Sequence, residues 1–429
     1  MNDLSFPNIW LSRKALDCFI QISTNNRNVK TKDCKSEGLY PVIDQGQQFI
    51  CGYIDDESKV IQVSNPLCVF GDHTRIIKWV TQDFVPGADG TKILEAEKFI
   101  FPKYGYYALR FIDIPDKGYS RHFKYLRELE IPISSLAEQK IIADKLDDLL
   151  ARVESIKTRL ENIPEILKKF RQSVLSTEFD YEIDDFSSLK NMELKDICRS
   201  ISDGDHQAPP KSNSGIPFLV ISDVNKGFVD FDNAVRRVPL EYYDNLKDIR
   251  KPDEKDILYT VTGSFGIPVL ITDNAKFCFQ RHIAIIKPNH ELIFYKYLYF
   301  YLKSPEVFKY AQRVATGTAQ KTVSLSNLRK FKIRLPSIFL QKKVVRKIEA
   351  LFLYADTIEK KSIEAMKNIN QLTQSILAKA FRGELTAQWR EENPELISGL
   401  NSAEALLEKI TAEKLAAGTI KKRAKKTSH

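Results

Sequence analysis

Residues that could perform catalysis are present, but few fall into the spacings that catalysis requires. The chain has no G-x-x-x-x-G-K-S/T phosphate-binding loop and no N/D-P-P-Y/F motif like that of amino-methyltransferases. Pro115-Asp116 followed by Glu138-Gln139-Lys140 fits a P-D…E-x-K nuclease pattern in spacing. A nuclease is therefore a minor alternative, which magnesium-dependent cleavage by the isolated chain would support. We predict no catalytic residues and no metal ligands.

Polar side chains that can read a nucleic acid lie in or beside glycine-rich turns. Arginine and lysine donate to guanine and phosphate, while glutamine and asparagine pair with adenine. The candidates are Gln45, Gln47, His73, Arg75, Lys92 and Arg121 in the first half, and His206, Gln207, Lys211, Arg281, Gln320 and Lys321 in the second. Gly263, Gly266 and Gly317 could let the backbone approach phosphates. Each donor could instead be an ordinary surface group or make a structural hydrogen bond.

The elements that must position these turns begin with a heptad repeat between Ser135 and Phe179. Its apolar residues alternate four and three positions apart, which predicts the seam of a left-handed coiled coil. Ser135 and Glu138 form an S-x-x-E capping box at the start of this helix. Pro164 is expected to kink it. The seam positions are Ile142, Leu146, Leu149, Val153, Ile156 and Leu160.

The same pattern returns 202 residues later, as the spacing of Ile142 and Val344 shows. Identities such as Gln139/Gln341 hold the register without a gap, and Arg382-Gly383 is expected to end the second helix. A repeat of this length predicts two equivalent structural units. The second set of seam positions is Val344, Ile348, Leu351, Ile358, Ile369 and Leu372.

The bulk composition is that of a globular protein with packed cores. The chain has 429 residues, 43% of them hydrophobic, and a net charge of +9, and no segment forms a basic block. Its six cysteines form no C-x-x-C pair, which favours reduced, mostly buried thiols over zinc. We see no signal peptide at the given start and no membrane-spanning run, so we expect a cytoplasmic protein.

The order of segments predicts five regions. Residues 1–134 are expected to form a globular domain, 135–180 the first spacer helix, 181–335 a second globular domain, 336–384 the second spacer helix, and 385–429 a C-terminal extension that is partly a disordered basic tail.

Within the two globular domains the expected elements follow from local patterns. Strands are expected at 40–43, 49–53, 60–63, 67–70 and 76–80, then at 218–221, 257–261, 267–271 and 282–286; helices are expected at 96–111 and 292–303, and an acidic linker at 179–188. The sequence of His73–Lys78 is similar to that of His282–Lys287, which suggests that the duplication includes the domains.

This order predicts an α+β protein with a pseudo-two-fold internal repeat. Because the second domain is compact, its two ends lie close together, so the two heptad helices must run antiparallel and separate the two domains. The seam of about 33 residues is roughly 50 Å long. On duplex DNA this corresponds to at most about 15 base pairs between domain centres. Since the domains differ in sequence, the two half-sites should differ, and footprinting of one continuous palindrome would contradict this.

From residue 1 to about 390 the chain resembles the DNA-specificity subunit of Type I restriction–modification systems. That family often begins its helices with I-P-x-P-x-L-x-E-Q; here the two copies are 131–139, which lacks the second proline, and 333–341, which lacks a proline and the glutamate. The phrases Tyr40–Gly46, Gly71–Arg75, Asp203–His206 and Ala315–Gln320 also resemble target-recognition-domain sequence.

The resemblance implies a non-catalytic subunit whose two target-recognition domains each read half of an asymmetric, bipartite DNA site. Its helices would set the spacing and dock two methyltransferase (modification) subunits, and restriction/translocase subunits would join the full complex. S-adenosylmethionine, ATP and Mg2+ would be used by these partners. The alternative is a coiled-coil scaffold with two protein-binding heads, which would show no sequence preference on DNA.

Overall fold

The chain is described here by a computed structural model covering residues 6–88, 90–118, 120–179, 191–204, 206 and 209–416. It divides into two units. The first combines Met1–Leu160 with Ala365–His429, and the second is Glu161–Glu364. Most of the linker expected at 179–188 and the basic run beginning at Lys421 lie outside the described residues.

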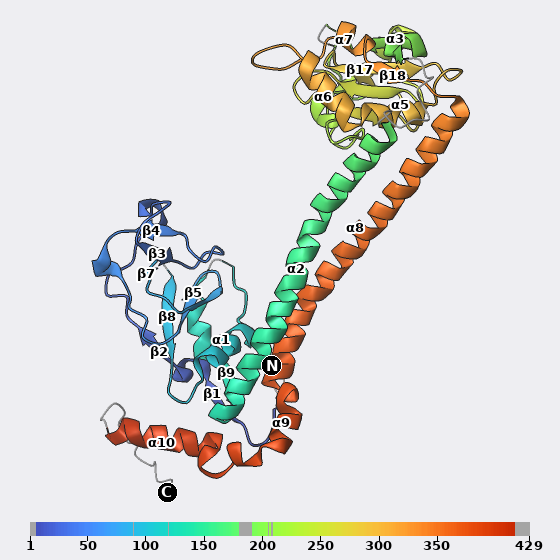
Figure 1. Ribbon diagram of the computed structural model, residues 1–429. Coiled ribbons are helices and arrows are strands. Elements are labelled where there is room, and N and C mark those ends of the chain that lie inside the picture. The colour runs from blue at the N-terminus through green and yellow to red at the C-terminus, as the bar shows by residue number, and fades with distance from the viewer. Residues whose placement is uncertain are drawn as a thin grey trace. The chain divides into compact units, whose positions relative to one another are not determined.

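Two helices of 44 residues, α2 (Leu136–Phe179) and α8 (Ile338–Phe381), contribute to both units. In the first unit Lys145 Nζ donates to the Leu385 carbonyl at 2.7 Å, so the start of α2 lies beside the end of α8. In the second unit Arg171 pairs with Asp356 and Lys347 pairs with Glu178. The helices are therefore antiparallel within each unit, as predicted (Figure 1).

In its described residues, the globular part of the first unit contains three small sheets and one α-helix. A two-stranded sheet pairs β1 (Leu11–Lys14) with β9 (Glu130–Ile133). The other two sheets have the orders β2-β8-β5-β6 and β4-β3-β7. Their bounds are β2 Phe19–Ile22, β3 Tyr40–Ile43, β4 Gly52–Ile54, β5 Leu67–Gly71, β6 Ile77–Val80, β7 Val85–Pro86 and β8 Thr91–Ala96, and α1 is Pro102–Phe111.

The second unit has the same strand topology although its domain sequence differs. β10 pairs with β18, and the other sheets have the orders β11-β17-β14-β15 and β13-β12-β16. Both three-stranded sheets contain one parallel pair, β3/β7 and β12/β16. The bounds are β10 Asn191–Glu193, β11 Cys198–Asp203, β12 Ile216–Leu219, β13 Arg237–Val238, β14 Ile257–Thr260, β15 Pro268–Leu270, β16 Cys278–Phe279, β17 Ile283–Pro288, β18 Lys332–Arg334, α3 Leu194–Ile197, α4 Leu240–Asp244, α5 Tyr295–Leu302, α6 Pro305–Val314 and α7 Leu325–Arg329.

Each four-stranded sheet is covered on both faces, which explains its continuous apolar strands. In β5, Phe70 joins the core that contains α1 and the long helices, and Val69 joins the core on the opposite face. In β14, Tyr259 and Leu258 divide between two cores in the same way. The duplication predicted from the helices therefore includes the domains.

Matched glutamines attach each long helix to its domain. Gln139 accepts from the Phe101 amide and donates to the carbonyls of Phe99 and Ser134. Gln341 makes the same three bonds, with Phe294, Leu292 and Pro336. Both glutamines are fully buried, so these bonds satisfy backbone groups at the start of α1 and of α5.

Most positions of the predicted seam are buried or half-buried. Ile142, Leu146, Val153, Ile348 and Ile369 are buried, whereas Ile156 and Leu372 are 47% and 46% exposed. The other five positions, Leu149, Leu160, Val344, Leu351 and Ile358, are half-buried. A continuous seam is thus too simple, because Ile156 and Leu372 are exposed although the seam residues on either side of each pack into the core of the first unit. α2 is assigned as one helix through Pro164.

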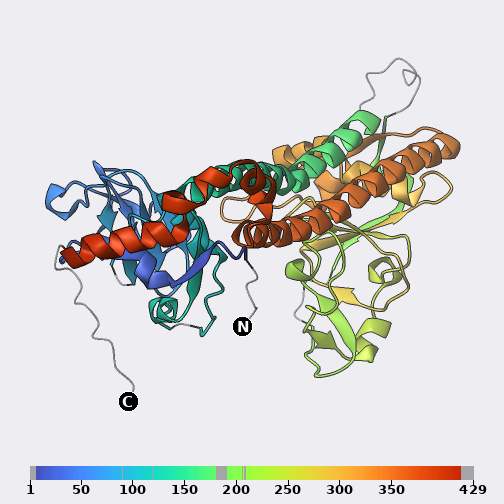
Figure 2. The ribbon, with the colours of Figure 1, turned by 90° about the horizontal axis from the view of Figure 1, so that it is seen from below.

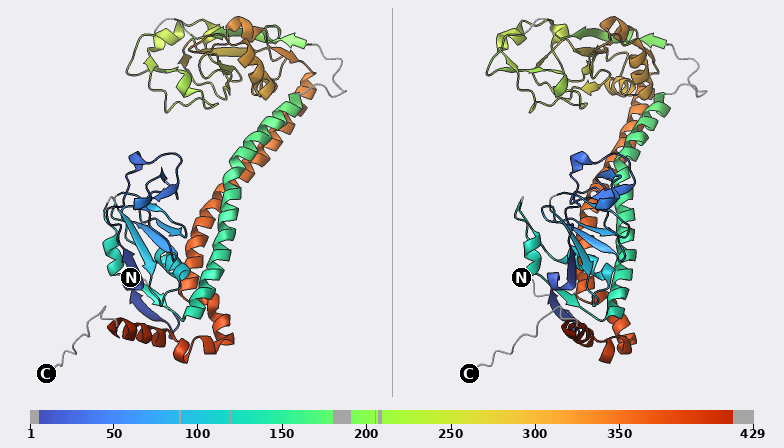
Figure 3. Two further views of the ribbon diagram at one scale, coloured as in Figure 1. Left: turned by 60° about the vertical axis from the view of Figure 1, so that its left-hand side comes forward. Right: turned by 90° about the vertical axis from the view of Figure 1, so that its left-hand side faces the viewer.

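The C-terminal extension is folded as far as Ala416, and the basic run for which disorder was expected lies outside the described residues. α9 (Ala387–Glu392) and α10 (Ala403–Ala416) follow α8, and α10 lies along the first domain (Figures 2 and 3). Leu407 and Ile410 enter its core, and Lys414 pairs with Glu97 at 2.6 Å. Leu407 and Ile410 lie three apart on one helix face, a spacing that could have predicted this packing.

Glu138 provides the buried polar contact of this extension. Its carboxylate is fully buried and accepts from Trp10 Nε1 (2.8 Å), Thr386 Oγ1 (2.7 Å) and Arg390 Nη1 (2.6 Å). Ser135 Oγ does accept from the Glu138 amide, as half of a capping box would require. The side chain of Glu138 binds the extension instead of capping the helix, which corrects the second half of that prediction.

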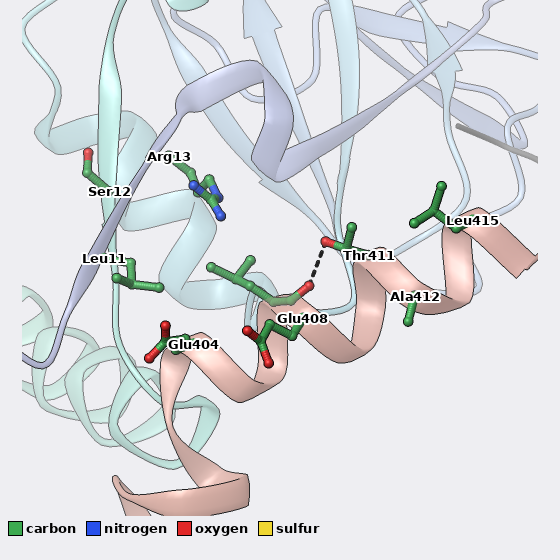
Figure 4. Close-up of a pocket in the computed structure, with 9 residues that line it drawn as sticks. Leu11, Ser12, Arg13, Glu404, Glu408, Thr411, Ala412 and Leu415 are labelled. Atoms are coloured by element: carbon green, nitrogen blue, oxygen red, sulfur yellow. Dashed lines mark hydrogen bonds between the residues drawn. The ribbon is translucent and has the colours of Figure 1, made fainter. Parts of the chain in front are cut away.

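A groove of about 500 Å3 remains between α10 and strand β1 (Figure 4). Leu11, Ser12 and Arg13 line one side, and Glu404 and Glu408 project from α10 on the other. Thr411 turns its hydroxyl onto the Leu407 carbonyl of its own helix.

Several local predictions were wrong. Residues 96–101 are not helical: β8 ends at Ala96 and α1 starts only at Pro102. Residues 60–63 form only an isolated bridge, between Ile61 and Phe84. The echo of His73–Lys78 and His282–Lys287 is coincidental, since these segments lead into β6 and β17, whereas topology matches β6 to β15 and β17 to β8.

None of the described helices combines the length and apolarity needed to cross a membrane. The six cysteines are free, and Cys18 and Cys68 are buried. Burial, the main cause for both thiols, raises their pKa from 9.0 to about 12. It also raises the pKa of the buried Tyr104 and Tyr259 hydroxyls.

We therefore expect the free energy of unfolding to fall as the pH rises from 9 towards 12. An acid whose pKa is higher in the folded state stabilises the fold below its unfolded pKa and loses that contribution as the pH rises through its folded pKa. Urea denaturation at pH 8, 9, 10 and 11 measures the trend, and Cys18→Ala with Cys68→Ala should reduce the slope. A pH-independent midpoint would contradict the assignment.

Candidate nucleic-acid interface

Four loops of the first unit converge at one edge of its four-stranded sheet. Gln45 follows β3, and its Oε1 accepts from the His73 amide in the β5–β6 turn at 3.0 Å. The Gly90 carbonyl, just before β8, accepts from the Asp72 amide at 2.7 Å. His73 Nδ1 lies 3.2 Å from the Ser120 carbonyl. We call this edge surface 1.

Surface 1 contains all six residues predicted for the first half of the chain. Gln47 and Arg121 are exposed, whereas Gln45, His73, Arg75 and Lys92 are half-buried. Lys92 Nζ lies 5.8 Å from the Phe123 ring centre. Gln45 and His73 help to build the loops, so Gln47 and Arg121 are the donors most open to a ligand.

Arg75 has a partner within surface 1. Its guanidinium donates to the Ile114 carbonyl at 3.1 Å and to Asp116 Oδ2 at 2.6 Å. The Gly118 amide and Arg75 lower the pKa of the Asp116 carboxyl below its usual value. Asp116 therefore stays charged at neutral pH, and a phosphate would compete with it for Arg75.

Gly90→Ala should disturb surface 1. Gly90 has φ +76°, a left-handed conformation that costs other residues on the order of 1–3 kcal/mol. An added Cβ would lie 2.8 Å from both Gln45 Oε1 and His73 Cδ2. We expect at least about a tenfold loss of DNA affinity, from displacing donors worth about 1–3 kcal/mol each. Titration of a duplex bearing the recognised sequence measures this loss.

Gly118→Ala is the matched control for this experiment. Gly118 has φ +63°, and a Cβ there would meet nothing within 4 Å. It carries a similar backbone cost without the clash. Equal losses in the two variants would show that the loop contacts around Gly90 do not matter for binding.

The topologically equivalent edge of the second unit contains four of its predicted residues, and we call it surface 2. The Gly204 amide donates to the Ile283 carbonyl, which joins the end of β11 to the start of β17. The Val261 amide donates to the His282 carbonyl, and the Gly263 amide to the Lys321 carbonyl at 3.0 Å. The residues gathered here, all exposed, are His206, Arg281, Gln320 and Lys321.

Histidines of surface 2 differ in their contacts. His206 Nε2 lies 2.8 Å from Asp203 Oδ2, which holds the imidazole on the end of β11. Burial, and then Arg281, lower the pKa of His282 below 6.5, so its ring is neutral at neutral pH. Arg281 Nε lies 3.4 Å from His282 Nε2, a neutral acceptor that leaves the arginine charge uncompensated.

Two predicted residues of the second half are not placed on surface 2. Gln207 lies outside the described residues. Lys211 is exposed, but its neighbour Ser212 bridges to Arg237 beside the three-stranded sheet, and no described contact joins it to the others. A Cβ added at Gly263 would meet no atom within 4 Å. Gly317 instead packs against its own loop, where a Cβ would lie 2.4 Å from the Gln320 carbonyl oxygen.

Sequence reasoning missed the carboxylates that organise these edges. Asp72 is buried; its carboxylate accepts from the Phe123 amide and its carbonyl from the His122 amide. Asp203 holds His206 and lies 3.7 Å from Arg250. Asp72 follows β5 directly and Asp203 is the last residue of β11, and each lies within three residues of a predicted histidine, so the end of a strand beside a histidine was a usable signal.

Residues of the nuclease-like pattern do not form a cluster. Glu138 is buried against Arg390, Asp116 pairs with Arg75, and Lys140 pairs with Asp144. Among the residues that the structure describes, no three histidine, cysteine or acidic side chains are arranged to hold a metal ion.

Comparison with known sequences gives consistent matches. Residues 187–368 match the model of a family described as Type I restriction modification DNA specificity domain. The chain is 41% identical over 323 residues to the Type I restriction enzyme EcoBI specificity subunit of Escherichia coli, covering 70% of this chain and 68% of that protein. It is 34% identical over 343 residues to the EcoDI specificity subunit of Escherichia coli, covering 73% and 76%.

Solved structures show the same fold at low sequence identity. A chain from the structure described as "Structural basis underlying complex assembly and conformational transition of the type I R-M system" aligns over 88% of this chain and 99% of its own, with a TM-score of 0.64 and 17% identity. The HsdS subunit from Thermoanaerobacter tengcongensis aligns over 88% and 98%, with a TM-score of 0.57 and 18% identity.

Proposed function

Because this chain belongs to the family of Type I restriction enzyme specificity subunits, we propose that it selects the DNA sequence on which a restriction–modification complex acts. Each globular domain reads one half of an asymmetric, bipartite site. The subunit performs no catalysis itself and works in the cytoplasm. The relatives favour neither a protein-binding scaffold nor a nuclease.

One observation carries the proposal beyond family membership. Donors chosen from sequence alone gather on topologically equivalent edges of two sheets with the same strand order. Lys92 lies at the start of β8 and Arg281 just before β17, and these two strands hold the same place in their sheets. Exposed arginine, lysine and glutamine side chains match the acceptors and donors of guanine and adenine. The two edges carry different residues, so the two half-sites should differ.

The helices supply a spacer and a docking surface in this proposal. Each has 44 residues, about 66 Å of helix, and α2 and α8 both run through the two units. A spacer of fixed length would fix the number of unread base pairs between the half-sites. The methyltransferase subunits that dock on it would bring S-adenosylmethionine, and restriction subunits would use ATP and Mg2+.

A selection from randomised duplexes tests the proposal. The full-length chain, co-purified with its methyltransferase partners, would be incubated with a random library and the retained duplexes sequenced. We expect two short, different sequence blocks separated by a gap of fixed length. Retention without any sequence preference would instead favour the scaffold.

Exposed apolar residues on α8 should weaken partner docking when made polar. The side chains of Leu353 and Ile363 are 67% and 68% exposed, and large apolar side chains exposed to solvent indicate an interaction surface. We expect Leu353→Ser with Ile363→Ser to weaken methyltransferase binding by about tenfold or more, since each buried apolar side chain contributes about 1.5–3 kcal/mol. Calorimetric titration of the partner measures it.

Leu400→Ser is the control, since Leu400 is 95% exposed in the C-terminal extension. It removes an exposed leucine away from the long helices. If the α8 variant binds the partner as well as the Leu400 variant does, this face of α8 is not the docking surface.

A further inference from the structure

A groove of about 720 Å3 lies on the second unit beside the turn between β14 and β15. Its walls are the last turns of α2, the loop at Asn225, and the beginning of α6. The polar side chains that line it include Gln172, Asn225, Lys226, Lys303, Lys309 and Gln312. None of its lining residues carries a carboxylate, so the charged side chains that line the groove are all lysines.

The lysines differ in how their charge is compensated. Lys226 pairs with Asp230 at 3.0 Å. Lys303 Nζ donates to the neutral Tyr299 hydroxyl at 3.1 Å, and Lys309 has no described polar partner. The Glu306 carboxylate of α6 accepts from Ser176 Oγ at 2.8 Å and makes no described ion pair with either lysine. Lys303 and Lys309 therefore carry charges at the start of α6 that no described ion pair compensates.

The groove is continuous with surface 2 along the backbone. Gly266 lines it, and the Gly266 amide donates to the Thr260 carbonyl at the end of β14. Three residues before Gly266, the Gly263 amide donates to the Lys321 carbonyl of surface 2. Gly266 has φ +87°, and a Cβ there would lie 2.7 Å from the Phe308 ring, so glycine lets this turn pack against α6. The same turn thus joins the basic groove to surface 2.

We propose that this groove binds backbone phosphates of the DNA duplex beside the half-site that surface 2 reads. The inference rests on the proposed function and adds a contact that carries no sequence information. Lysine acts as a point-charge donor to phosphate, and amide side chains are common phosphate contacts. The base-reading donors of surface 2 and these backbone donors would then hold adjacent parts of one duplex, so the groove would strengthen binding to every sequence.

The test compares wild type with Lys303→Gln/Lys309→Gln, in the complex with the methyltransferase partners. Two duplexes are titrated, one bearing the selected bipartite sequence and one with the half-site of surface 2 scrambled, from 50 to 300 mM salt. Each lost phosphate contact should reduce the slope of log affinity against log salt by about 0.9. We expect a reduction of about 2, and the same fold-loss of affinity on both duplexes.

Lys330→Gln/Lys332→Gln is the matched control, because both lysines are exposed in the same unit but do not line the groove. It removes the same charge and should leave the slope nearly unchanged. An unchanged slope in the groove variant, or equal changes in both variants, would overturn the proposal. So would unchanged DNA affinity with weakened partner binding, which would identify an acidic protein surface as the ligand. If wild type fails to discriminate the two duplexes, the proposed function fails instead.

Discussion

Replacing Glu138 by leucine should lower the unfolding free energy of the first unit by about 3–5 kcal/mol, the cost of removing one partner of a buried ion pair. Arg390, whose side chain is 15% exposed, would keep its charge and lose the Glu138 oxygen at 2.6 Å. Trp10 Nε1 and Thr386 Oγ1 would lose the same acceptor. Urea denaturation followed by tryptophan fluorescence measures the change.

The second copy of the helix supplies the compensating substitution. Leu340 occupies the position equivalent to Glu138. Glu138→Leu with Arg390→Leu should therefore recover most of the loss, because an apolar pair needs no acceptor. If Glu138→Leu costs less than about 1 kcal/mol, or the double variant is no better, the carboxylate does not hold the extension as described.

Arg281→Ala with Lys321→Ala should reduce affinity for the cognate duplex by about a hundredfold or more. Each good contact to a base edge contributes about 1–3 kcal/mol of discrimination, and both side chains are exposed on surface 2. Sequence selection by the variant should relax one block of the bipartite site and leave the other intact. Surface 1 lies on the other globular domain and is unaltered by these changes.

Two outcomes separate base reading from general charge. Lys195→Ala with Lys332→Ala removes two exposed positive charges from the same unit and should leave both blocks intact. If the surface 2 variant loses affinity while both blocks stay equally sharp, Arg281 and Lys321 contact only the backbone. Relaxation of both blocks would show that the two edges are not independent readers.

The long helices were predictable because one signal repeats without interruption. Seven-residue periodicity, one constant offset and the pair Gln139/Gln341 all indicated two equivalent helices. In the structure the two glutamines make equivalent hydrogen bonds to the backbone, a reason for their repetition that periodicity could not supply. The domains were harder, because their shared topology lies in strand order and not in sequence.

Local errors arose where tertiary contacts override a local pattern. Residues 96–101, which are the end of β8 and the turn after it, were predicted to begin a helix because they lie directly before the helical run of α1. Glu138 matched a capping box in sequence, but its partners Trp10 and Arg390 are distant along the chain. The expectation of a partly disordered basic tail came from the basic run that begins at Lys421, and it did not include the helix α10 that precedes this run.

For the candidate interface, residue type and glycine-rich context placed ten of the twelve predicted donors on the two edges. They did not separate Gln47, which is exposed, from Gln45, which builds the loop around His73. That difference depends on which loops meet, and single-sequence patterns carry no information about it.

The central claim is that two different DNA-recognition domains are held apart by one helical spacer. Its most direct test is the methylation pattern of DNA from cells that express this chain with its partner subunits. We predict methylation within one asymmetric motif, made of two different short blocks with a fixed number of unspecified bases between them. Methylation at a single uninterrupted palindrome would contradict the account.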